Sequence, residues 1–185
     1  MIKIFFQKTY YLCLLGAFLL FAGGQVYSNE TVSEDPVSSG QEMDLLPCED
    51  PGLDLIFYCN PRWEIQTEDN LVFAVILKEP NITMTITRST DPINSLDYLT
   101  DNILQDLGSY ATGYRKEIMQ LDIGEAVHVW GLHQKYRELY LEDYYFVKDD
   151  QLYSVLFSVN PAEQMGQYKP LLDKIVQNIH PLSTR

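Results

Sequence analysis

A row of tyrosines and carboxylates is the pattern in this sequence with the clearest potential for chemistry. Glu138 and Glu142 alternate with Tyr136, Tyr140 and Tyr144 along one long predicted strand, and residues two apart in a strand point to the same face. Aromatic faces attract cations and carboxylates bind hard metal ions. Glu138, Tyr140 and Glu142 are therefore candidate ligands for a cation, a divalent metal or a glycan-like molecule. The same pattern also fits a sheet face that a helix partly covers, with tyrosine hydroxyls reaching water.

Residues that could support catalysis are few. A nucleophilic Ser or Cys needs a base within reach, and the sequence has no G-x-S-x-G elbow. Of the three histidines, His128 and His133 are five apart on one predicted strand, so their side chains point to opposite faces. His180 ends the last predicted helix, where a positive charge would complement the helix dipole. We expect no catalytic residues, no cofactor and no enzymatic activity.

Two cysteines, Cys48 and Cys59, lie beyond the amino-terminal segment. In an oxidising compartment such a pair is more often joined than free, and a short closed loop would contribute roughly 2–3 kcal/mol. Pro51-Gly52 suggests a turn, however, and a simple hairpin there would place Cys48 opposite Leu55. The sequence leaves both the bonded and the free state open. A zinc site from these two residues alone is not expected, since zinc takes four ligands.

The first 28 residues have the pattern of a secretory signal peptide. Lys3 and Lys8 precede an apolar run over residues 12–24, and small residues follow, up to Ser28. The apolar run is shorter than the roughly 20 residues that span a bilayer. We expect a secreted or periplasmic protein without stable membrane insertion after cleavage. An uncleaved membrane anchor is the alternative.

Charge restricts the partners of the remaining 157 residues. Removing Lys3 and Lys8 from the 13 basic residues leaves 11 against 26 acidic ones, a net charge of −15. This excludes nucleic acid, whose phosphates are bound by Lys and Arg. A cationic partner, a divalent cation or simple solubility remain open.

The chain divides into three parts. Residues 1–28 form the leader, and residues 29–46 are rich in Ser, Glu, Asp and Gly, which predicts an acidic flexible linker. Residues 47–182 are the length of one domain.

Hydrophobic periodicity predicts strands and two helices in that domain. We expect helices over 94–107 and 169–179, with Pro170 tolerated only near the start of the second. The strands are expected over 53–59, 71–77, 82–87, 114–122, 125–133, 136–148 and 151–159. Short connections at 123–124, 134–135 and 149–150 favour antiparallel hairpins. The predicted fold is α+β: a mostly antiparallel sheet of six to seven strands with helices on both faces.

Three segments in this order resemble the PsbP-like α/β/α sandwich family, named after an extrinsic subunit of the photosynthetic oxygen-evolving complex. They are LIFYCNPRWEI, which contains Pro61 and Trp63, then SLDYLTDNILQDL, and finally QYKPLLDKIVQNI. The resemblance covers about residues 50–182, and no functional residue of the family can be transferred through it. It implies an exported, non-enzymatic accessory or binding protein of the bacterial envelope, whose partner is an envelope protein. The alternative is a small-ligand or divalent-metal binding protein that uses Glu138, Tyr140 and Glu142.

Overall fold

The computed structural model describes residues 44–92 and 111–182. The predicted leader, most of the predicted linker and the helix expected over residues 94–107 lie outside this range. Among the described helices, none combines the length and the apolar character that crossing a membrane requires.

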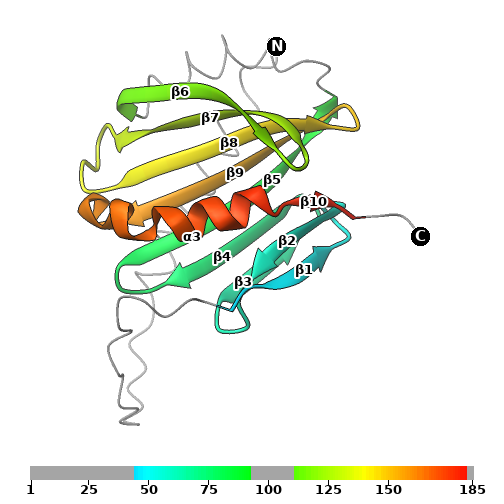
Figure 1. Cartoon of the computed structure of the whole chain (residues 1–185), viewed down its shortest axis with the longest axis horizontal. Helices are drawn as coiled ribbons and strands as arrows, with labels where there is room; N and C mark the ends of the chain where they lie inside the picture. Colours follow the sequence, from blue (N-terminus) through cyan, green and yellow to red (C-terminus); the bar gives the residue numbers. More distant parts are fainter. Residues whose placement is uncertain (1–43, 93–110, 183–185) are drawn as a thin grey trace. The chain divides into compact units, whose positions relative to one another are not determined.

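Seven of the described strands form one sheet, in the order β3-β4-β5-β9-β8-β7-β6 (Figure 1). Every neighbouring pair in it is antiparallel. Its strands are β3 (Glu64–Glu68), β4 (Leu71–Leu77), β5 (Asn81–Pro92), β6 (Ala111–Leu121), β7 (Gly124–His133), β8 (Tyr140–Lys148) and β9 (Gln151–Asn160). The expected α+β class and mostly antiparallel sheet are confirmed, as are the three hairpins that join β6 to β9.

The loop between β7 and β8 corrects one predicted strand. We expected a strand from Tyr136, but β8 begins at Tyr140, and the preceding residues 134–139 form a loop. His133 stabilises this loop, because its Nδ1 accepts hydrogen bonds from the backbone N–H groups of Lys135 and Tyr136, at 3.1 and 3.2 Å. The loop closes where the His133 N–H donates to the carbonyl of Leu139, at 2.8 Å.

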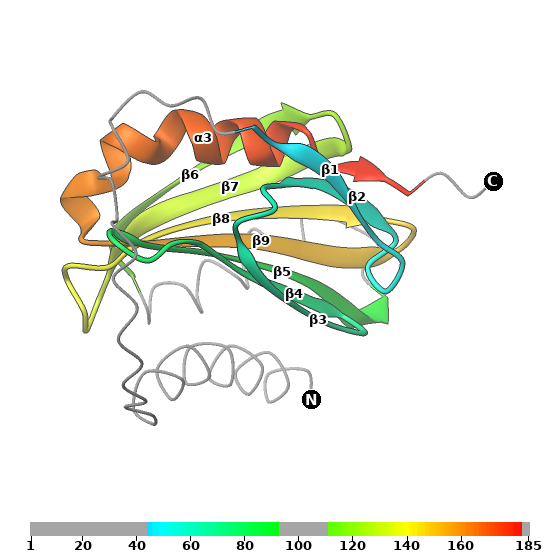
Figure 2. The same cartoon turned by 90° about the horizontal axis from the view of Figure 1, so that it is seen from below.

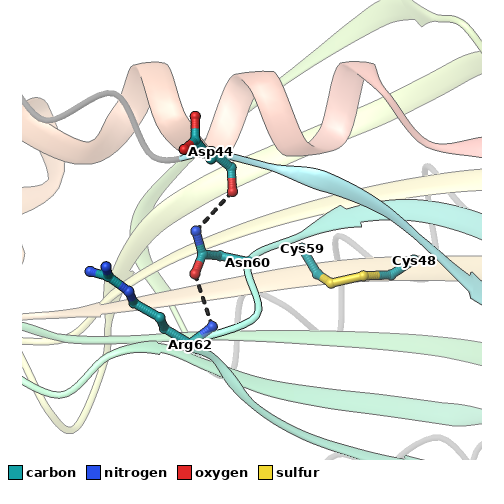
Figure 3. Close-up of a disulfide and its surroundings, with 5 residues drawn as sticks. All are labelled: Asp44, Cys48, Cys59, Asn60 and Arg62. Carbon is teal, nitrogen blue, oxygen red and sulfur yellow. Dashed lines mark hydrogen bonds between the residues drawn. A yellow bond between two sulfur atoms is a disulfide. The ribbon is translucent and has the colours of Figure 1, made fainter.

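A second, three-stranded sheet has the order β1-β2-β10, with β1 (Leu46–Asp50), β2 (Leu55–Cys59) and β10 (His180–Pro181). Cys48 and Cys59 are joined by a disulfide, with their Cα atoms 5.9 Å apart (Figure 3). Beside it, the Asn60 side chain donates to the carbonyl of Asp44 at 2.8 Å and accepts from the Arg62 N–H at 2.9 Å. The disulfide and this side chain both fasten the start of the domain to β2.

The turn between β1 and β2 is longer than expected, and this corrects the predicted register. Cys48 lies opposite Phe57, not Leu55. The reason is a four-residue turn over residues 51–54, in which Asp50 Oδ1 accepts a hydrogen bond from the Leu53 N–H at 2.7 Å. The shift of two residues makes Cys59 a diagonal neighbour of Cys48, which is within disulfide reach.

The helix α3 (Met165–Gln177) follows a short 3₁₀ turn, η1 (Ala162–Gln164). It begins four residues before the predicted start at Lys169, so Pro170 lies inside it. Pro170 has no N–H to donate to the carbonyl of Gly166, four residues earlier, so one backbone hydrogen bond is missing from the second turn of α3. Its inward side is marked by Met165, Leu172, Ile175 and Val176, all buried.

Helix α3 and the small sheet lie on the same face of the seven-stranded sheet (Figure 2). We expected helices on both faces, and α3 is the one that falls within the described residues. The apolar core fills the space between these layers. Its fully buried side chains include Leu55 of β2, Met84 of β5, Phe157 of β9 and Leu172 of α3.

Candidate functional site

Four side chains of the sheet meet on the face that carries α3. Glu117 of β6 lies opposite His128 of β7, which lies opposite Tyr144 of β8. Directly opposed residues of an antiparallel sheet share a face, and so does Glu142, two residues before Tyr144. Strand alternation and register therefore bring these four residues together.

His128 links two carboxylates. Its Nδ1 lies 3.0 Å from Glu117 Oε1 and its Nε2 lies 2.7 Å from Glu142 Oε1. Each ring nitrogen therefore faces a carboxylate oxygen. The His128 side chain is only 6 % exposed, whereas the Glu117 side chain is 54 % exposed. His128 thus connects a buried acid to one at the surface.

Two aromatic rings enclose the imidazole. Trp130 stacks on one side, with ring centroids 4.4 Å apart, and Tyr144 stacks at 4.2 Å with an interplanar angle of 1°. These contacts fix the orientation of His128 and exclude water from its faces. They explain why the ring is buried.

Glu142 is the centre of the site. It is fully buried, and its Oε1 accepts hydrogen bonds from His128, from the Tyr144 hydroxyl at 2.6 Å and from Lys169 Nζ at 2.9 Å. Burial alone would raise the pKa of Glu142. The hydrogen bonds from His128, Tyr144 and Lys169, together with the positive charge of Lys169, outweigh burial and hold the pKa below its ordinary value. Glu142 Oε2 is also buried and has no hydrogen-bond partner among the described residues.

Helix α3 contributes the other side of the site. Lys169 and Asp173 lie one turn apart on α3, where they form an ion pair with each other. The Lys169 ammonium also donates to the Tyr144 hydroxyl, at 3.3 Å. Burial lowers the pKa of Lys169, but its bonds to Asp173 and Glu142 raise it more, so the net direction is upward. We refer to Glu117, His128, Glu142, Tyr144, Lys169 and Asp173 as the ionic network.

The two tyrosines near Glu142 are held in their neutral form. Burial, and then the negative charge of Glu142, raises the pKa of Tyr144. The same two causes raise the pKa of Tyr140 to about 12, although the positive charge of Arg115 opposes them. Neither tyrosine is therefore available as an anionic ligand near neutral pH.

The structure places the three predicted ligand residues in different surroundings. Glu138 is exposed in the loop before β8, and its carbonyl accepts from the Ala162 N–H at 2.7 Å. Tyr140 is half-buried on β8, and Glu142 is fully buried in the ionic network. In the described part of the chain, no group of three or more His, Cys, Asp or Glu side chains is arranged to hold a metal ion.

Sequence reasoning missed Glu117, His128 and Lys169 as members of this site. The pairing of Glu117 with His128 follows from the position of the turn before β7. This turn consists of Asp122 and Ile123, which sets Glu117 opposite His128. The expected turn, at 123–124, lies one residue later, which changes the register by two.

Comparison with solved structures identifies the fold. The chain aligns with cyanobacterial PsbP (CyanoP) from Synechocystis sp. PCC 6803 at 14 % identity and a TM-score of 0.52, covering 85 % of this chain and 99 % of that one. It aligns with the Ran-binding protein Mog1p of Saccharomyces cerevisiae at 10 % identity and a TM-score of 0.50, covering 76 % and 97 %. The chain has the PsbP/Mog1 fold. The resemblance noted in the sequence is thereby confirmed for the fold.

At these identities the likeness concerns the fold alone. A point mutant of Mog1 also aligns, at 11 % identity and a TM-score of 0.51, covering 77 % of this chain and 98 % of that one. No protein-family model matches the chain, and no curated protein matches its sequence. Within the PsbP/Mog1 fold of this chain, the ionic network joins the carboxyl-terminal helix to three consecutive strands of the sheet, β6 to β8.

Proposed function

We propose that this protein is an exported, non-enzymatic binding or accessory protein of the bacterial cell envelope that acts by contacting another protein. The observation that carries the proposal is the ionic network. Its acid and base groups bond to one another, and the central two, Glu142 and His128, are 0 % and 4 % exposed. Groups committed in this way stabilise the fold and are not presented to a substrate.

The fold supports a binding role. One protein of the same fold is described as Ran-binding, so this arrangement of sheet and helix is compatible with a function that consists of contact with a protein. Fold alone does not fix function, and the partner of this chain is inferred from its own surface below.

Two features support export. The leader has the charge, apolar and small-residue regions of a signal peptide. The disulfide between Cys48 and Cys59 is of the kind that persists in oxidising compartments such as the periplasm. Both features support a location outside the cytoplasm, in an oxidising compartment.

The test is site-specific photo-crosslinking of the full chain in the envelope of its native host. A photoreactive amino acid is placed in turn at three exposed positions, Arg62, Ile118 and Glu138. We expect a discrete protein adduct from at least one position, in the fraction that carries the disulfide. Absence of an adduct from all three positions, or a reduced protein found only in the cytoplasm, would contradict the proposal.

A second candidate function is binding of a small ligand or divalent cation by Glu138, Tyr140 and Glu142. One observation favours it: Glu142 Oε2 is buried without a hydrogen-bond partner among the described residues, and such an atom can accept from a bound molecule. Calorimetric titration with calcium, manganese and zinc tests it, on the unmodified chain and on Glu138→Gln/Glu142→Gln. Binding heat that the unmodified chain shows and the double variant lacks would support this function. Absence of heat with all three ions would contradict it.

A further inference from the structure

Strand β6 is an edge of the seven-stranded sheet, since β7 is its one neighbour in the described strand order. Its central side chains are exposed, and Ile118 stands out with 65 % of its surface accessible. An edge strand presents unpaired backbone groups that can add a strand from another chain. An exposed aliphatic side chain at its centre gives such an addition an apolar contact.

The charges of this edge differ from those of the whole protein. The chain has a net charge of −13, yet β6 carries two consecutive cations, Arg115 and Lys116, both exposed and directed to opposite faces of the sheet. Neither forms an ion pair with any residue that the structure describes. The neighbouring Glu117 is held by His128 at 3.0 Å. The edge therefore presents two uncommitted cations, and its one acid is already engaged.

The edge is also held in a fixed conformation. Natural edges are commonly protected by bulges, and the irregularity of β6 lies near its start, between Thr112 and Arg115. From Arg115 to Leu121 the pairing with β7 is regular. The bond from Glu117 to His128, and from His128 to Glu142, fastens this part of the edge to the core. A preorganised strand loses little conformational entropy on binding.

We propose that the β6 edge binds an extended, acidic segment of a protein partner as an added strand. Its carboxylates contact Arg115 and Lys116, and an aliphatic side chain of the segment covers Ile118. This inference rests on the proposed function, that of a protein-binding module, and specifies the surface and the partner's chemistry.

Charge argues against a second copy of this chain as the occupant. If two β6 strands paired with Ile118 opposite Ile118, Lys116 would face Gln120 and Arg115 would face Leu121. Neither cation would meet a carboxylate, and two chains of net charge −13 repel each other. An acidic partner segment satisfies both cations.

The test uses the exported full chain and a short synthetic Asp/Val peptide built on the segment Val-Thr-Asp-Asp. In antiparallel pairing this order sets Val opposite Ile118 and the two Asp residues opposite Lys116 and Arg115. The corresponding Lys/Val peptide, with Lys in place of Asp, is the reference. Binding is measured by fluorescence anisotropy, and hydrogen exchange locates it. We expect the Asp/Val peptide to bind and to protect the amides of residues 115–121. The variant Arg115→Glu/Lys116→Glu should weaken binding about tenfold or more, which corresponds to about 1.4 kcal/mol.

The matched control is Arg62→Glu/Lys174→Glu, which changes the net charge equally at two exposed positions outside β6. We expect it to leave binding within about twofold, a difference of roughly 0.4 kcal/mol. Equal weakening by both double variants, or protection away from β6, would overturn the inference. So would a dimer of the unmodified chain that Ile118→Asp dissociates, because the second copy would then be the occupant. Adducts from Arg62 or Glu138 but none from Ile118 would overturn the inference and leave the proposed function standing.

Discussion

The imidazole of His128 and the phenol of Tyr144 lie face to face across β7 and β8, with an angle of 1° between their planes. Both residues also donate to the same atom, Glu142 Oε1. The stacked pair and the carboxylate thus form one unit, in which ring packing orients the two donors. The contributions of packing and hydrogen bonding can be separated by substitution.

Removing only the hydroxyl of Tyr144 should destabilise the protein. Tyr144→Phe keeps the ring on His128 but takes one donor from a fully buried carboxylate. We expect the free energy of unfolding to fall by about 1–3 kcal/mol, measured by urea denaturation at neutral pH. The control is Tyr168→Phe on α3. If Tyr168→Phe lowers the free energy of unfolding as much as Tyr144→Phe does, the hydrogen bond to Glu142 is not the cause of the loss.

Acid should destabilise the protein through Glu142. Its pKa in the folded protein lies below its ordinary value near 4.5, so the folded state favours the ionised carboxylate. The contribution of Glu142 is therefore present above about pH 4.5 and is lost as the pH falls through the lower, folded-state pKa. Urea unfolding at a series of pH values should show a shallower decline in Glu142→Gln than in the unmodified chain.

The comparison for this acid effect is Glu138→Gln, which removes an exposed carboxylate from the neighbouring loop. It should leave the pH dependence as it is in the unmodified chain. An identical decline in Glu142→Gln would mean that Glu142 does not carry the acid sensitivity.

Alkali should act through Tyr140. Burial and the charge of Glu142 raise its pKa from 10.0 to about 12. Because the folded-state value is the higher one, the stabilising contribution is complete below pH 10 and is lost as the pH rises through 12. A spectrophotometric titration of tyrosinate should show one late-ionising tyrosine fewer in Tyr140→Phe. In Arg115→Gln, which removes the opposing positive charge, Tyr140 should ionise later still; earlier ionisation would contradict the assignment.

Contact between β7 and β6 should depend on the absence of a side chain at Gly131. A Cβ there would lie 3.0 Å from the backbone Cα of Tyr114, so Gly131→Ala should force the strands apart and cost about 1–3 kcal/mol. Gly166 on α3 has open space around its Cβ direction, so Gly166→Ala should stabilise the protein by about 0.5–1 kcal/mol. Thermal unfolding of both variants compares them. Equal effects of the two substitutions would refute the steric explanation.

The strands were predictable because each carries its own signal. The apolar run of β4 predicted its bounds, and alternation in β5 predicted its start, although β5 continues five residues beyond the expected end, to Pro92. The short strands β1, β3 and β10 were not expected as strands of the sheets, because segments of two to five residues give too little periodicity. Helix α3 was found, but its start was misplaced because Pro170 suggested a boundary.

The ionic network was not predictable, because it depends on register. A two-residue connection from His133 to Tyr136 would have placed His128 opposite Leu141, on the other face from Glu142. The actual loop over residues 134–139 places His128 opposite Tyr144. Since successive residues alternate between faces, such a change of register by an odd number decides whether the two groups meet. The length of the loop depends on hydrogen bonds to the His133 ring, which no local sequence pattern reveals.

The pairing of β10 with β2 has a consequence for the order of assembly. Strand β2 lies between β1, near the beginning of the described chain, and β10, at its end. A growing or translocating polypeptide cannot complete this small sheet until residues 180–181 have emerged. The domain can therefore mature only after these residues are available, and until then the side of β2 that pairs with β10 stays unpaired.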